Sequence, residues 1–242
     1  MNRKKFLFYH LGSSIVVGTI IGIIVFGIWY PAPLATAIGV LSIFTMLIVI
    51  DVVIGPLLTF LVYKEGKRSL KFDLSVIISV QIAALFYGVF TISQGRPVWI
   101  VFNVDRFDIV QSYEISPEYL LKAKEEFSGH NWFGPKWVAA TKSSDNEVNS
   151  DLLFESLSGG ADLPQRPDLY VPYEQELSSV SMKAIPVDEL KKFNSSHDVD
   201  RVLRLYPQAD SYLPLVSKKQ HMVVLIQKNT AEVIAVVALT PW

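Results

Sequence analysis

Three long apolar runs fill the first part of this chain of 242 residues and constrain it to a membrane protein. They span residues 11–30, 34–63 and 72–93, and each reaches the roughly 20 residues with which a helix crosses a bilayer. A cleaved signal peptide is the alternative for the first run, but that run exceeds the usual signal core of about 7–15 residues. The sequence therefore predicts three transmembrane helices.

The apolar runs end at a short segment that changes the character of the chain. Gly95, Arg96 and Pro97 form a predicted hinge, because Gly relaxes the backbone, Arg favours the lipid headgroup level and Pro cannot continue a helix. The β-branched and aromatic run at 98–104, which includes Trp99, predicts a first strand. We expect a membrane domain at residues 1–94 and an α+β domain at residues 95–242.

Basic residues set the expected orientation. Arg3, Lys4 and Lys5 precede the first run, and the loop at 64–71 carries four more basic residues. Short loops rich in Lys and Arg stay in the cytoplasm. Three crossings then place the N-terminus in the cytoplasm and the α+β domain outside, in the periplasm of a Gram-negative cell. The net charge of −1 comes without a basic stripe, which argues against a nucleic-acid partner, and the absence of cysteine excludes disulfides and thiolate chemistry.

Small residues recur at a four-residue spacing in two of the runs. Ser14, Gly18 and Gly22 share one face of the first predicted helix, and Ser75, Ser79 and Ala83 share one face of the third. Such faces let another membrane helix approach closely. The helix that approaches is either one of this protein's own or one that belongs to a partner.

Asp51 is the only acidic residue of the second run, which a break at Gly55-Pro56 is expected to interrupt. Two positions are open for Asp51. If the helix ends near residue 53, Asp51 lies at the cytoplasmic surface and pairs with a basic residue of the loop. If the helix lies further along the chain, Asp51 is within the membrane, where an ionisable group is costly and points to a function. Gln81, in the middle of the third run, is expected to bond to a neighbouring helix.

The remainder of the chain alternates helix and strand signals, which predicts an α+β domain. Residues 98–104 and 107–111 form either a hairpin or one interrupted strand, and Ser116-Pro117 starts a helix that Gly129 ends. Three prolines impose an extended surface segment at 162–172. The other expected elements are a strand at 137–141, helices at 147–157, 173–180, 187–193 and 198–205, and a terminal hairpin at 220–227 and 232–239.

Catalytic and cofactor-binding motifs do not emerge from the sequence, so we expect neither an enzyme nor a cofactor. The four histidines, at positions 10, 130, 197 and 221, lack the i, i+4 spacing of a helical metal site, and no phosphate-binding glycine loop or dinucleotide fingerprint occurs. Asp105, Arg106 and Asp108 offer carboxylates beside a cation. Strand alternation would place Asp105 on the face opposite Arg106 and Asp108, which favours a structural role for these three residues.

Several strings resemble the type IV pilin accessory proteins of the TfpX/TfpZ kind. They are WYPAPL at 29–34, DVVIGPLLT at 51–59, SLKFDLS at 69–75 and GRPVWIVFNVDRF at 95–107, with shorter matches at 132–136, 213–215 and 241–242. This resemblance implies an inner-membrane protein that works beside the major pilin in assembling type IV pili. It implies no catalytic residue.

The resemblance and the small-residue faces together suggest a mechanism. One of the two faces would hold the membrane helix of the major pilin, while the periplasmic domain contacts the pilin head, with a free sheet edge such as the last hairpin as a docking strand. Other pilus-assembly proteins and membrane lipid are further expected partners. Two alternatives stay open: a membrane-bound enzyme that modifies pilin with Asp51 as its acid, and a structural subunit of the pilus machine without direct pilin contact.

Overall fold

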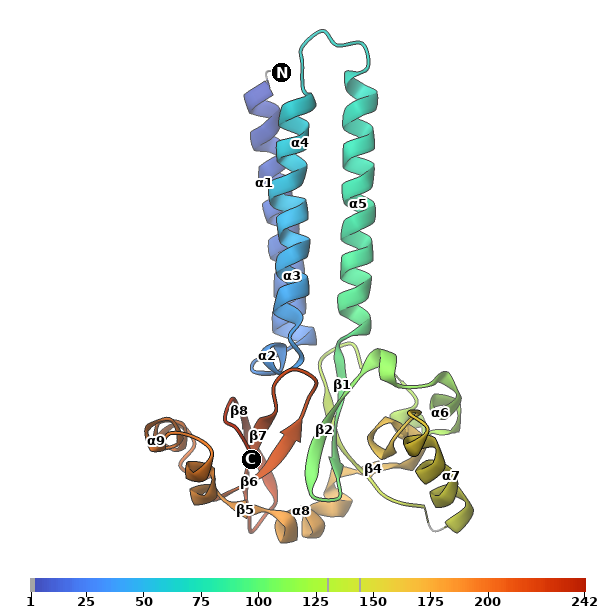
Figure 1. Cartoon of the computed structure of the whole chain (residues 1–242), viewed down its shortest axis with the longest axis vertical. Coiled ribbons are helices and arrows are strands. Elements are labelled where there is room, and N and C mark those ends of the chain that lie inside the picture. The colour runs from blue at the N-terminus through green and yellow to red at the C-terminus, as the bar shows by residue number, and fades with distance from the viewer. Residues whose placement is uncertain (1–2, 130, 144) are drawn as a thin grey trace.

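The computed structural model describes residues 3–129, 131–143 and 145–242, with three long helices at one end and a sheet domain at the other (Figure 1). The first span is α1 (Arg3–Ile24) with a π-helical turn (Val25–Trp29), and the third is α5 (Leu70–Gln94). The second consists of α3 (Val40–Ile48), a π-helical segment (Val49–Ile54) and α4 (Gly55–Val62). All three are long and apolar enough to cross a membrane, which confirms the predicted membrane protein.

The second span differs from its prediction in where it is interrupted. The helix is broken at Gly39, which has a φ of 85° and separates α3 from the short helix α2 (Leu34–Ile38). The break expected at Gly55-Pro56 was wrong, because Gly55 is right-handed helical and Pro56 lies in the first turn of α4. The π-helical segment before Pro56 shifts the hydrogen-bonding register, so the missing N–H does not end the helix.

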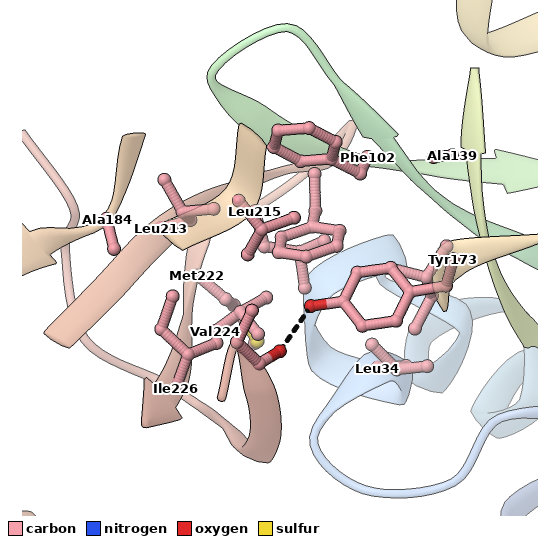
Figure 2. Packing of buried hydrophobic residues seen from close by; sticks show 14 of the residues in the cluster. Leu34, Phe102, Ala139, Tyr173, Ala184, Leu213, Leu215, Met222, Val224 and Ile226 are labelled. Carbon is pink, nitrogen blue, oxygen red and sulfur yellow. Dashed lines mark hydrogen bonds between the residues drawn. The ribbon is translucent and has the colours of Figure 1, made fainter. Parts of the chain in front are cut away.

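Helix α2 joins the membrane helices to the sheet domain. Leu34 and Ala37 belong to the main apolar core of the sheet domain, where Leu34 lies beside Tyr173 (Figure 2). The carbonyl of Ala37 accepts hydrogen bonds from Ser217 Oγ at 2.6 Å and from the backbone N–H groups of Lys219 and Gln220 at 3.1 Å each. The connection between the first two spans is therefore packed into the sheet domain; the division at residues 94 and 95 stays a prediction.

In the part of the chain that the structure describes, eight strands form one mixed sheet in the order β4-β3-β1-β2-β6-β7-β8, with β5 paired to β6 beside this path. Strand β1 pairs parallel with β3 and antiparallel with β2, and β2 pairs parallel with β6. The strands are β1 (Pro97–Asn103), β2 (Arg106–Gln111), β3 (Lys136–Ala140), β4 (Tyr170–Pro172), β5 (Ile185–Pro186), β6 (Ser211–Val216), β7 (Met222–Gln227) and β8 (Glu232–Val237).

Helices cover the sheet, and this mixture confirms the α+β class. They are α6 (Pro117–Lys122), α7 (Asn146–Leu157), α8 (Leu177–Lys183) and α9 (Ser196–Leu205). Strand β1 is buried along its whole length and supplies Ile100 and Phe102 to one apolar core and Val98, Trp99 and Val101 to a second.

Most of the expected elements are present, but two expectations were wrong and one central strand was missed. Residues 97–111 form the hairpin rather than one strand, and the terminal hairpin is confirmed as β7 and β8. The helix capped by Ser116 ends at Lys122 instead of near Gly129. The segment 162–172 is not a simple extended surface segment, because it forms two 3-10 turns and β4 and buries Leu163, Arg166 and Tyr170. Strand β6, in the middle of the sheet, was not predicted.

Candidate functional site: the membrane helices and their junction with the sheet domain

The face of α1 with Ser14, Gly18 and Gly22 packs on the protein's own second span. Ser14 and Gly18 are buried. A Cβ at Gly18 would lie 2.8 Å from Ile48 Cδ1, and one at Gly22 would lie 3.3 Å from Phe44 Cζ. Glycine at these positions allows α3 to approach closely, so this face serves the packing of the protein's own helices.

An open groove runs beside this face, between α1 and α3. It has a volume of about 720 Å³, and Thr19 and Ile23 of α1 and Phe26 of the π-helical turn line one side of it. Gly27, at its end, is shared with a second groove of about 540 Å³ on the sheet domain. The second groove is lined by the loop 31–34, the turn 133–135, Trp137 and Val236 of β8. The two grooves therefore meet at Gly27 and together run from the membrane helices to the sheet domain.

The small-residue face of α5 has a different environment from that of α1. Ser75, Ser79 and Ala83 are all exposed on the surface of the helix bundle. Helix α5 instead meets α3 and α4 through another face, where a Cβ at Gly88 would lie 2.4 Å from Leu47 Cδ1. The face predicted for α5 is thus open to lipid or to a partner.

Asp51 lies at the middle of the span Val40–Val62, eleven residues from each end, and is 8% exposed. Gln81 Nε2 of α5 donates to the backbone carbonyl of Asp51 at 3.2 Å and to Asp51 Oδ1 at 3.5 Å. This overturns the first of the two expected positions, at the membrane surface with a basic partner from the loop. The predicted bond of Gln81 to a neighbouring helix is confirmed.

Polar side chains from all three spans gather around Asp51. His10 Nδ1 of α1 lies 3.0 Å from Thr59 Oγ1 of α4, and His10 and Gln81 share a cavity of about 210 Å³ with Asp51. The side chain of Gln81 lies directly over Gly55, where a Cβ would come within 1.6 Å of its Nε2. Gly55 therefore makes room for the polar contact between the second and third spans. His10 could not be predicted from the sequence as a neighbour of Asp51, since the two residues lie 41 positions apart.

The junction at Gly95, Arg96 and Pro97 is packed rather than open to the lipid surface. Arg96 was expected at the headgroup level, yet it is only 2% exposed. Its guanidinium stacks 3.9 Å from the centre of the Trp132 ring, Nη1 donates to the Ser93 carbonyl at 2.5 Å, and Nε donates to the Asn131 carbonyl at 3.1 Å. Burial lowers the pKa of Arg96. Gly95 lies close to the hydroxyl of Tyr30, which donates to the Ile92 carbonyl at 2.7 Å.

Trp99 belongs to the core and not to a surface. It is 1% exposed and packs edge-on against Phe127 and Tyr170. Trp99 Nε1 is buried without a hydrogen-bond partner in the part of the chain that the structure describes. Trp99 is therefore inaccessible to a partner protein.

Asp105, Arg106 and Asp108 lie at the tip of the first hairpin. Asp105 is exposed in the turn, after Val104 with its φ of 62°, whereas Asp108 lies within β2. Arg106 Nε lies 3.4 Å from Asp108 Oδ2, which also accepts a bond from Asn103 Nδ2 at 3.1 Å. Burial raises the pKa of Asp108. The geometry pairs Arg106 with Asp108 and leaves Asp105 apart.

Within residues 3–129, 131–143 and 145–242, no group of three or more His, Cys, Asp or Glu side chains is placed to hold a metal ion. His197 is exposed, and the ring of His221 lies 5.4 Å from that of Trp242. His130 lies outside the described residues.

The chain is therefore a membrane protein with three apolar spans, buried polar contacts between them and an α+β domain packed against one end. The chain belongs to the family of fimbrial assembly proteins. The fimbrial assembly proteins of serogroups E1 and I of Dichelobacter nodosus are each 32% identical to it over 95% of both chains. That of serogroups C1 and C2 is 34% identical over its whole length and 51% of this chain. The family model for fimbrial assembly protein FimB matches residues 1–39. No solved structure matches this chain.

Proposed function

We propose that this protein is an accessory factor of type IV pilus biogenesis that binds the membrane-anchored major pilin before or during assembly. Its relationship to fimbrial assembly proteins supports a role in pilus biogenesis. The resemblance of residues 29–108 to pilin accessory proteins supports the major pilin as the partner. In this proposal residues 1–94 form a membrane domain in the bacterial inner membrane. Residues 95–242 form the periplasmic domain.

Charge and packing together support the proposed orientation. Helix α2 is packed into the sheet domain, so the connection between the first two spans and the sheet domain lie on one side of the membrane. The N-terminus and the loop between α4 and α5 lie at the opposite end of the helices (Figure 1). Lys and Arg are concentrated at that end, which supports a cytoplasmic N-terminus and a periplasmic sheet domain.

The observation that carries the proposal is the continuous path formed by the two grooves. Between Ile15 and Gly27 the first groove follows α1 and the π-helical turn after it for about 18 Å at roughly 1.5 Å per residue. A membrane helix that lies there meets small and apolar side chains, which suit close helix packing. Its continuation into the periplasm reaches the second groove without leaving the surface. A pilin before assembly, with a membrane helix followed by a periplasmic head, has this shape.

The periplasmic end offers two contacts for the pilin head. Phe133 lines the second groove and is 91% exposed, so it is available to an apolar partner. Strand β8 is an outer strand of the sheet, and Val236 of β8 lines the same groove. A partner strand that pairs with β8 would extend the sheet by backbone hydrogen bonds. The exposed face of α5 with Ser75, Ser79 and Ala83 is the alternative place for the pilin helix.

The test fills each candidate surface and measures the capture of pilin. Thr19→Trp blocks the groove, Ser79→Trp blocks the face of α5, and Val80→Trp alters an exposed position of α5 outside both. We expect Thr19→Trp to reduce co-purification of pilin with the full-length protein by about tenfold, equivalent to about 1.4 kcal/mol, at unchanged protein abundance. Loss with Ser79→Trp alone would move the site to α5. Equal capture by all three variants would refute the proposal.

A further inference from the structure

A cavity of about 510 Å³ lies where α3 and α5 reach the sheet domain, away from the grooves proposed for pilin. On the membrane side its walls are apolar and include Val40, Ile43 and Phe90. Ile43 and Phe90 are 42% and 60% exposed, so this part of the cavity faces the hydrocarbon of the bilayer. Polar side chains line the opposite end and come from the end of α5 and from the sheet domain: Gln94, Gln111, Tyr113 and Lys218.

Lys218 supplies the charge at the polar end. Its Nζ lies 2.8 Å from Glu114 Oε1 and donates to the hydroxyl of Tyr113, while its side chain is 55% exposed. An ammonium group has three N–H donors, so one remains beyond these two contacts. Glu114 is itself fixed, because its Oε2 accepts the backbone N–H of Gln111 at 2.7 Å. Lys218 therefore presents an oriented donor to an acceptor within the cavity.

The loop that carries Lys218 is fixed to the membrane helices. Its neighbours Ser217, Lys219 and Gln220 all donate to the Ala37 carbonyl at the end of α2. The side chain of Lys219 crosses Gly39, where a Cβ would lie 2.4 Å from Lys219 Cδ. Glycine at this position lets the loop lie flat on the start of the second span. The charged and apolar walls are thereby held at a fixed separation.

We propose that this cavity binds one phospholipid of the leaflet next to the sheet domain, with its phosphate at Lys218 and an acyl chain along Ile43 and Phe90. The occupant must be amphiphilic, because one end of the cavity is charged and hydrogen-bonding and the other faces hydrocarbon. Gln94 is the last residue of α5, which places the polar end at the depth of the headgroups. A lipid in this position would join α3, α5 and the sheet domain through one ligand. The inference stands independently of the pilin proposal.

Native mass spectrometry of the full-length protein tests the proposal. The detergent-purified protein is titrated with phosphatidylethanolamine and, separately, with phosphatidylglycerol. Lys218→Met keeps the length of the side chain but removes the charge, and Ile43→Trp fills the apolar end. We expect each substitution to weaken retention of the first phospholipid by about tenfold. Lys218→Met removes a hydrogen bond from a charged group, and Ile43→Trp removes the space for an acyl chain. Lys219→Met, a neighbouring cation outside the cavity walls, should bind within about twofold of the wild type.

Three results would overturn the proposal. Equal lipid retention by the wild type, Lys218→Met and Ile43→Trp would show unspecific adsorption, and loss with only one substitution would show that the two ends do not hold a single molecule. Inorganic phosphate supplies the headgroup chemistry alone. If millimolar phosphate raised the melting temperature of the wild type but not of Lys218→Met, while phospholipid had no effect, the site would bind free phosphate and not lipid.

Discussion

In the membrane helices the buried side chains include Ser14, Asp51, Thr59 and Gln81, whereas strands β6 and β7 bury an almost wholly apolar set. Exposure is reversed as well, because Ile, Leu and Phe cover the outside of the helices. The bilayer supplies the apolar surroundings of the helices, so contacts between them depend on close approach and on polar bonds. The sheet domain is surrounded by water, so its stability depends on its apolar core. The same substitution should therefore have different effects in the two regions.

Removal of apolar volume gives the largest expected difference between the regions. Leu213 in β6 is fully buried, and Leu213→Ala should lower the free energy of unfolding by about 2–5 kcal/mol. Leu57 in α4 is 52% exposed, and Leu57→Ala should cost less than about 1 kcal/mol, since lipid fills the space. Thermal unfolding in detergent measures both. Equal losses of stability would show that the two regions do not differ in this way.

Added volume at a helix contact should be the next largest effect. Gly55→Leu places a side chain where Gln81 lies, so we expect a loss of about 1–3 kcal/mol or more and a lower abundance in membranes. Gly12→Leu is the matched control, because a Cβ at Gly12 meets nothing within 4 Å. If the two variants accumulated equally, the contact of Gly55 with Gln81 would have no importance for stability.

Within the membrane part, the two small-residue faces should respond differently to added volume. Gly18→Leu must displace Ile48 of the second span, and it should cost about 1 kcal/mol of stability because the contact is with the end of a flexible side chain. Ser79→Leu adds a side chain on an exposed face and should leave stability within about 0.5 kcal/mol of the wild type. Melting temperatures of the two variants in the same detergent decide this. A larger loss for Ser79→Leu would mean that a partner helix covers α5 even in the purified protein.

The smallest expected effect concerns a polar group in the sheet domain. Burial raises the pKa of Asp108, so the folded state holds its proton to a higher pH than the unfolded chain does, and stability falls as pH rises through that interval. Asp108→Asn removes this penalty and should raise stability at pH 7 by less than about 1 kcal/mol. The gain should vanish below about pH 3, where the carboxyl is protonated in both states. A variant less stable than the wild type at pH 7 would show that the ion pair with Arg106 outweighs burial.

The sequence was sufficient for features that depend on local composition. The apolar runs predicted three spans, and alternation with turn residues predicted the terminal hairpin. Strand β6 was missed because Pro214 interrupts its strand signal. In the structure Pro214 falls between the pairing of Ser211 and Tyr212 with β5 and that of Leu215 and Val216 with β2. The missing N–H of Pro214 therefore interrupts no series of hydrogen bonds between strands on that side of β6.

Features that join distant residues could not be predicted in this way. A spacing of four identified both small-residue faces, but it did not distinguish the one that packs inside from the one that stays exposed. The gathering of His10, Asp51 and Gln81 depends on how three helices pack. The insertion of α2 into the core of the sheet domain likewise depends on tertiary contacts of Leu34 and Ala37.

Photo-crosslinking in cells tests whether the groove between α1 and α3 holds the pilin helix. A photoreactive residue replaces Ile23 in the full-length protein, and Val80 carries the same probe as a control on α5. We predict a pilin adduct from position 23 whose crosslink maps to the pilin membrane helix, and little or none from position 80. The groove would not be the site of the pilin helix if the two positions gave equal pilin adducts. The same conclusion would follow if position 23 gave no adduct while pilin was present in the membrane.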